Sequence, residues 1–279
     1  MKETHTPKIV DQALSHPIKY TLMLTKEVFA LNKGLFLGVT AIIILLTFLS
    51  ALPIIGFAAT ILSGILMFAI LFFVGKTFYQ AHTMNEFVEE IRSATLSSVW
   101  SRYWNPAMGA YLGWVGIMLI FLIISGIIVN ITGGADALLS ATKSGDPMAM
   151  FAILPSIIIP LILFALIFYV SPLVIANLLK TDNFNDGFKA VFTLFDRDVW
   201  HRAFKGEYFK YMTLLGLVLI ALMVVVSLVL SILMSLLTSI SPSMSIAGMM
   251  IMVIMMMILQ VVMNIFYAIS SVIADRMTR

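Results

Sequence analysis

The most prominent feature of the chain is a series of long apolar stretches separated by polar segments. A helix needs about 20 residues, at 1.5 Å each, to cross the ~30 Å hydrocarbon core of a bilayer. The apolar residues do not alternate with polar ones at every second position, as the strands of a membrane barrel require. The pattern therefore predicts six transmembrane helices, at residues 35–52, 57–75, 108–131, 148–179, 211–240 and 244–274.

Polar segments divide these six stretches into three pairs. They cover residues 1–34, 76–107 and 180–210. Apolar residues recur on one helical face in such segments, most regularly at Phe184, Phe188, Val191, Phe192, Phe195 and Val199. We therefore predict an all-α integral membrane protein with a single transmembrane domain over residues 1–279. It consists of three hairpins, each preceded by a cytoplasmic amphipathic helix.

Prolines interrupt the fourth apolar stretch. Pro155, Pro160 and Pro172 each lack the backbone N–H group that a helix interior uses as a donor. We expect the helix to be broken or kinked at these positions.

Composition and charge support the membrane class and give an orientation. The chain is 61% hydrophobic and 11% charged, against roughly 45–50% and about 25% in soluble domains. Six crossings place 16 of the 17 Lys and Arg residues on one side, and only Lys143 lies in a loop on the other. Because positive residues remain in the cytoplasm, both termini are predicted to be cytoplasmic.

An internal repeat appears when the sequence is compared with itself at a shift of 100 residues. Identical pairs are Asn85 and Asn185, Val99 and Val199, Trp100 and Trp200, Arg102 and Arg202, Tyr111 and Tyr211, Gly116 and Gly216, Leu119 and Leu219, and Ile120 and Ile220. Both copies begin on the same side of the membrane, which makes the repeat parallel. Many alternating-access carriers are built from inverted repeats instead.

Aromatic and basic residues lie where the chain is expected to re-enter the membrane. Trp100 and Trp200 are predicted to anchor at the lipid interface, and Arg102 and Arg202 to extend toward the headgroups. Membrane lipids are therefore expected partners.

Small residues at helical spacing indicate close contacts between helices. Gly109 and Gly113 open the third span, and a stripe along the fifth span consists of Ser227, Ser231, Ser235 and Ser239. Small residues allow neighbouring helices to approach closely, within one chain or between chains. The serines alternatively border a path for a polar solute.

The sequence holds little that indicates catalysis. It has no cysteine, no Gly-rich phosphate loop and no metalloprotease or nucleophile-elbow motif. No basic cluster of the kind that binds nucleic acid is present. We therefore predict no enzyme activity and no catalytic, cofactor-binding or metal site. Whether a divalent cation binds either of two loose groups is left open; they are His82, Glu86 and Glu90, and Asp196, Asp198 and His201.

The stretch from Phe184 through Lys189 to Trp200, followed by an apolar span, resembles the repeated unit of uncharacterised bacterial six-helix inner-membrane proteins. These include the YciC-like group and the membrane domain found beside glycerophosphodiester phosphodiesterases. The resemblance implies the fold and a bacterial plasma membrane, and no reaction. We predict a scaffold or accessory subunit that organises a membrane protein partner, a second copy or local lipid. The alternative is a carrier or channel for an apolar or amphiphilic solute.

Overall fold

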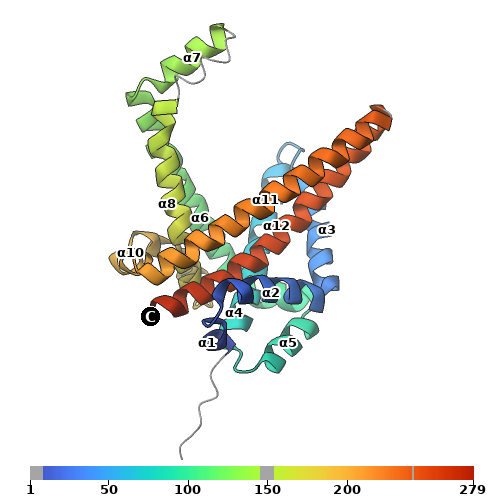
Figure 1. Cartoon of the computed structure of the whole chain (residues 1–279), viewed down its shortest axis with the longest axis vertical. Coiled ribbons are helices and arrows are strands. Elements are labelled where there is room, and N and C mark those ends of the chain that lie inside the picture. Colours follow the sequence, from blue (N-terminus) through green and yellow to red (C-terminus); the bar gives the residue numbers. More distant parts are fainter. Residues whose placement is uncertain (1–8, 145–153, 241) are drawn as a thin grey trace, which may run out of the picture.

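The computed structural model describes residues 9–144, 154–240 and 242–279, and its regular elements in these ranges are all helices (Figure 1). In chain order they are α1 (Ile9–Ala13), α2 (Pro17–Leu31), α3 (Lys33–Leu49), α4 (Ile55–Gln80), α5 (Met84–Ser93), α6 (Leu96–Ile131), α7 (Gly134–Ser144), α8 (Leu154–Leu178), α9 (Phe184–Val191), the 3-10 helix η2 (Phe192–Phe195), α10 (Arg197–Ala203), α11 (Gly206–Ile240) and α12 (Pro242–Thr278). The predicted all-α class is confirmed.

Five of these helices are long and apolar enough to cross a membrane: α4, α6, α8, α11 and α12. The remaining span, predicted first in the chain at residues 35–52, corresponds to α3, which has only 17 residues. It reaches the required length only together with α2, and the two helices meet at an angle of 87°. The described residues therefore provide five candidate spans, or six if this bent pair is one span.

The helix ends differ from the predicted boundaries. The span predicted to begin at residue 108 begins at Leu96, because Thr95 starts the helix there. Its hydroxyl accepts a hydrogen bond from the Ser98 amide at 3.2 Å, and its own amide donates to the Ser98 hydroxyl at 2.9 Å. Such a capping box satisfies amides that the first helical turn leaves unpaired. The predicted polar segment 76–107 is thus largely helical, and its two ends belong to the spans α4 and α6, with the separate helix α5 between them.

The fourth predicted span begins outside the described residues and continues as α8. The helix is not broken at Pro160 and Pro172, because α8 runs through both prolines without interruption, and the alternative of a kink stays a prediction. A proline removes one backbone hydrogen bond, whereas a broken helix in an apolar environment leaves several polar groups unpaired.

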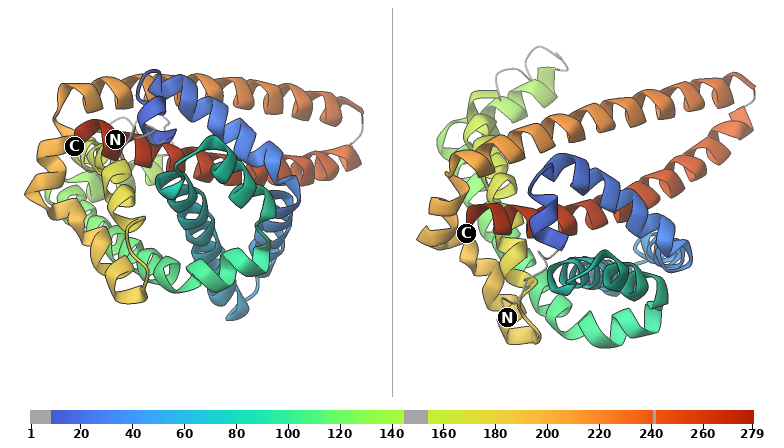
Figure 2. Two further views of the ribbon diagram at one scale, coloured as in Figure 1. Left: turned by 90° about the horizontal axis from the view of Figure 1, so that it is seen from below. Right: turned by 60° about the horizontal axis from the view of Figure 1, so that its bottom comes forward.

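The short helices gather at one end of the molecule (Figures 1 and 2). This short-helix end contains α1, α2, α5, α9 and α10, together with the last turn of α12. Helix α7, the last turns of α11 and the first turns of α12 lie away from this end. The α6–α8 pair and the α11–α12 pair extend from the short-helix end in different directions (Figure 1).

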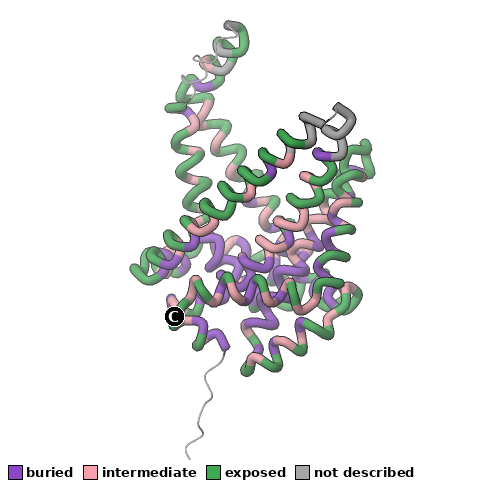
Figure 3. The backbone as a smooth tube through the Cα atoms, turned by 45° about the vertical axis from the view of Figure 1, so that its right-hand side comes forward, coloured by how far each residue is buried: buried purple, intermediate pink, exposed green. Residues whose placement is uncertain are grey.

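The core lies where α12 meets α4, α8 and α2. Half of the residues in the most apolar stretch of α4 are buried, but only 11% of those in α6 and α11. Figure 3 shows the buried residues concentrated toward the short-helix end and exposed residues along the projecting helices. The apolar stretches of α6 and α11 therefore contribute little to the core.

Candidate functional site at the short-helix end

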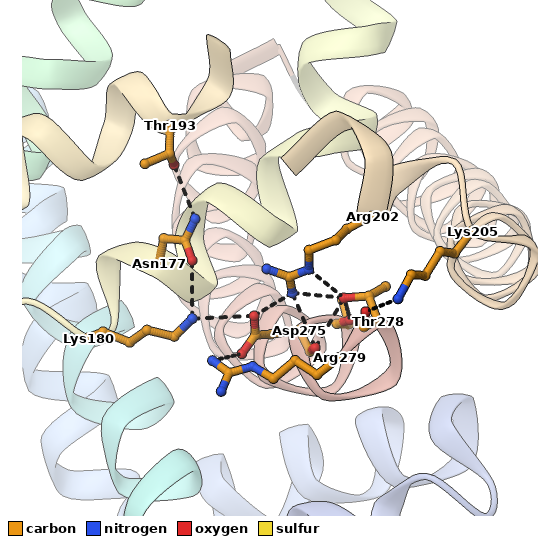
Figure 4. A network of polar contacts seen from close by, with 9 residues as sticks. Asn177, Lys180, Thr193, Arg202, Lys205, Asp275, Thr278 and Arg279 are labelled. Atoms are coloured by element: carbon orange, nitrogen blue, oxygen red, sulfur yellow. Dashed lines mark hydrogen bonds and ion pairs between the residues drawn. The ribbon is translucent and has the colours of Figure 1, made fainter. Parts of the chain in front are cut away.

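A buried carboxylate joins three cations at the end of α12 (Figure 4). Asp275 is 1% exposed. One carboxylate oxygen lies 2.5 Å from the Arg202 guanidinium of α10 and 3.4 Å from the Lys180 ammonium, which follows α8. The other lies 2.8 Å from the Arg279 guanidinium. A single acidic side chain thus connects three parts of the chain.

Hydrogen bonds extend this network. The Arg202 guanidinium donates to the Thr278 hydroxyl at 2.8 and 3.1 Å. Lys180 donates to the side-chain oxygen of Asn177 at 3.1 Å, and Asn177 donates to the Thr193 hydroxyl of η2 at 3.3 Å. The network therefore fixes the last turns of α8 and α12 relative to η2 and α10.

The electrostatics of the network are asymmetric, since one carboxylate faces three cations. Burial lowers the pKa of Lys180, and the nearby Asp275 carboxylate offsets part of this effect. The paired charges satisfy one another in a position where an isolated charge would be costly. The geometry indicates a role in holding helices together.

A buried cation lies at the end of α4. The Lys76 side chain is 5% exposed and forms an ion pair with Asp182, whose side chain is 86% exposed. The ammonium also donates to the Thr181 carbonyl and lies 5.7 Å from the centre of the Phe72 ring. Lys76 thus fixes the connection between α8 and α9 to α4.

The predicted interface residues have different environments. Arg102 is exposed and pairs with Glu90 at 3.2 Å. The prediction that Arg202 extends toward headgroups is wrong, because its guanidinium is bound to Asp275 and its side chain is 12% exposed. Trp200 is half-buried and donates its indole N–H to the Leu194 carbonyl at 2.7 Å. Trp100 is half-buried beside Trp104, with ring centres 5.7 Å apart.

The predicted glycine pair lies where α6 meets α9. A Cβ atom at Gly109 would lie 2.1 Å from the backbone oxygen of Phe184, and one at Gly113 would lie 2.8 Å from a methyl group of Val191. A third glycine, Gly187 of α9, approaches the backbone oxygen of Pro106 in the same way. The three glycines therefore let two helix backbones come close together.

The predicted serine stripe lies on the outer part of α11. Ser227, Ser231 and Ser235 are exposed, and the side chain of Ser239 lies outside the described residues. Ser227 and Ser231 border a groove of about 470 Å³ between α11 and α12. The expected close packing on these two serines is not found within the described chain, because α11 leaves them facing outward. A contact with another chain stays a prediction.

The two groups considered for a divalent cation do not form a metal site. In the ranges the structure describes, no three His, Asp or Glu side chains come close enough to hold an ion. Glu86 instead accepts a hydrogen bond from the His82 amide at 2.8 Å, and Glu90 pairs with Arg102. Asp196 and His201 are exposed on or beside α10.

The fold and the apolar helices define the class: an all-helical, multi-pass membrane protein. No protein-family model, curated protein or solved structure matches the chain. The resemblance to YciC-like proteins therefore stays a prediction.

Proposed function

We propose that the chain is a non-enzymatic scaffold or accessory subunit of a bacterial plasma membrane that binds a partner membrane protein through α11. The exposure of α11 carries this proposal. In the described residues α11 packs mainly against α12, and it carries a long series of exposed apolar side chains, among them Leu217, Val225 and Leu228. Ser227 and Ser231 are exposed small residues within this surface, and small residues let a second helix approach closely.

The order of the helices supports three related units, each made of shorter helices followed by a pair of long ones. Each of the packed pairs α3–α4, α6–α8 and α11–α12 follows shorter helices. Thr83 caps α5 and Asn183 caps α9, at equivalent positions of the 100-residue repeat. The ring pair Trp100–Trp104 has an equivalent in Trp200–Phe204, with ring centres 6.1 Å apart. We propose three hairpins, each preceded by an amphipathic helix, and a parallel duplication.

We further propose that the short-helix end is cytoplasmic, since it holds most of the Lys and Arg residues. Single cysteines at Ser140 of α7 and Ser97 of α6 test this orientation, because both positions are exposed. In intact cells, an impermeant thiol reagent is expected to label only the cysteine at 140. Labelling of residue 97 alone would reverse the orientation, and lysed cells supply the control in which both react.

The partner is tested by photocrosslinking in the native membrane. A photoreactive amino acid at Leu228 of α11 is expected to give one protein adduct of defined mass, because this residue is 58% exposed beside Ser227 and Ser231. The matched control is Leu45 of α3, also 58% exposed. Leu45 is expected to crosslink to lipid only.

The products are identified by mass spectrometry after extraction into detergent-free polymer discs. A protein adduct whose yield falls when Ser227 and Ser231 are both changed to leucine supports the proposal, since bulky side chains block close approach. An adduct of twice the chain mass identifies the partner as a second copy. Lipid adducts alone at Leu228 would refute the proposed role.

A small pocket among four helices favours the alternative of a carrier for an apolar or amphiphilic solute. It has a volume of about 230 Å³ and lies between α4, α6, α8 and α12, with Trp114, Asn264 and Tyr267 among its lining residues. The Trp114 indole N–H is buried without a hydrogen-bond partner, and such a donor suits a carbonyl or hydroxyl group of a solute. A stoichiometric small molecule in the disc preparation, with no protein adduct, would favour this alternative.

A further inference from the structure

A pocket of about 950 Å³ lies at the short-helix end between α2, the start of α11 and the end of α12. Tyr211, 2% exposed, lies at its inner side, where its hydroxyl is 2.9 Å from the hydroxyl of Thr21. This hydrogen bond joins α11 to α2. The pocket is therefore bounded by helices that the fold holds in place.

Charged side chains line part of this pocket, at Lys19 of α2 and at Glu207 and Lys210 of α11. Glu207 is the acidic residue among the lining side chains. In the described ranges, neither lysine has a carboxylate within ion-pair distance. Arg276 also lines the pocket, but its guanidinium is held by Asp11 at 2.7 and 3.3 Å. The two lysines are thus available to an anion.

Apolar side chains also line the pocket. Leu22 of α2 is 42% exposed and Leu214 of α11 is 40% exposed, and both line the pocket. Further along α11, Leu217 and Ile220 are 58% and 63% exposed. An apolar path therefore leads from the lysines along a candidate membrane span. A free phosphate ion would use neither this path nor most of the volume.

We propose that this pocket binds an anionic phospholipid, with its phosphate between Lys19 and Lys210 and its acyl chains against Leu22 and Leu214. The charge of the lysines matches the phosphate, and the apolar wall matches the chains. The pocket uses the first turns of α11, up to Leu214, whereas the serine groove begins at Ser227. The proposal is independent of the partner proposed for α11.

The test measures lipid retention by native mass spectrometry, after the purified full chain has been equilibrated with micelles containing equal amounts of phosphatidylglycerol and phosphatidylcholine. Wild type is expected to retain phosphatidylglycerol preferentially. The double variant Lys19→Gln/Lys210→Gln is expected to retain on the order of tenfold less, because each lysine near an anionic headgroup contributes to binding. Both lysines are exposed, so thermal unfolding is expected to match wild type.

The control Lys26→Gln/Lys189→Gln removes the same charge from exposed positions on α2 and α9 that do not line the pocket. It is expected to retain phosphatidylglycerol as wild type does. Leu214→Trp fills the apolar part without changing charge, and it is expected to lower retention severalfold. If the control lost as much phosphatidylglycerol as the double variant, or if Leu214→Trp lost none, the lipid would be held by the general surface potential. Either result would overturn the proposed binding in the pocket.

A competition experiment separates the lipid from its headgroup. Glycerol phosphate is expected not to displace bound phosphatidylglycerol at equal concentration, because it lacks acyl chains. Displacement at that concentration would identify a site for soluble phosphate compounds and overturn the lipid proposal. Equal retention of the two lipids by wild type would also overturn it.

Discussion

Replacing Asp275 with alanine is expected to lower the free energy of unfolding by roughly 3–5 kcal/mol, the range for removing one partner of a buried ion pair. The carboxylate is 1% exposed and pairs with Lys180, Arg202 and Arg279. Its loss leaves the Arg202 guanidinium, 12% exposed, without its charged acceptor. Asp275→Asn is expected to lie between wild type and alanine, because the amide retains an oxygen acceptor but no charge.

The measurement is reversible unfolding of the purified chain in mild detergent. Asp198→Ala serves as the control, since Asp198 is exposed in the first turn of α10 and pairs with no cation in the described residues. This variant is expected to lower the free energy of unfolding by less than about 1 kcal/mol, the contribution of an acidic side chain near a helix N-terminus. Equal losses for the two variants would refute the structural role of the Asp275 network.

A double-mutant cycle tests the same network through the shortest ion pair that Asp275 makes, with Arg202 at 2.5 Å. Arg202→Met combined with Asp275→Leu removes both charges and leaves apolar groups of similar size. The combined loss is expected to be smaller than the sum of the single losses, because neither partner is left buried and unpaired. Additive losses would show that the two residues contribute independently.

The membrane class could be predicted from sequence because length and apolarity alone determine whether a helix can cross a bilayer. The helix ends could not be predicted as well, because they depend on local hydrogen bonds. Thr95 and Ser98 begin α6 twelve residues before its predicted start, inside a stretch with a mixed polar pattern. Asn32 caps α3 and separates it from α2, which meets α3 at 87°. Hydropathy alone does not mark this bend.

The two repeat arginines show why the candidate site was harder to predict. Arg102 and Arg202 have the same local sequence, Val-Trp followed by one residue and Arg. Arg102 pairs with Glu90, 12 residues away, whereas Arg202 pairs with Asp275, 73 residues away. No local pattern distinguishes them. The available signal was that Asp275 is the only acidic residue after Glu207, at the end of a long apolar helix.

The glycines were predicted in part. The spacing of Gly109 and Gly113 correctly marks a face that a neighbour approaches closely, but it does not identify that neighbour. The structure shows that it is α9, a helix of eight residues. Gly187 completes the contact from the other side, and its sequence context contains no second small residue at a spacing of four.

Replacing Gly109 with alanine is expected to destabilise the protein by about 3 kcal/mol, at the upper end of the usual cost of overpacking. The added Cβ atom would lie 2.1 Å from the backbone oxygen of Phe184 and 2.9 Å from the backbone nitrogen of Phe188. Backbone atoms cannot rotate away as a side chain does, so α6 and α9 must separate.

Gly126→Ala is the matched control on the same helix, because a Cβ atom there would have no neighbour within 4 Å. Alanine favours a helix over glycine by up to about 1 kcal/mol, so this variant is expected to be neutral or slightly more stable than wild type. Both variants make the same chemical change, and their difference in unfolding free energy therefore isolates the contact with α9. If Gly109→Ala were as stable as Gly126→Ala, α9 would not pack on α6 as closely as the structure shows.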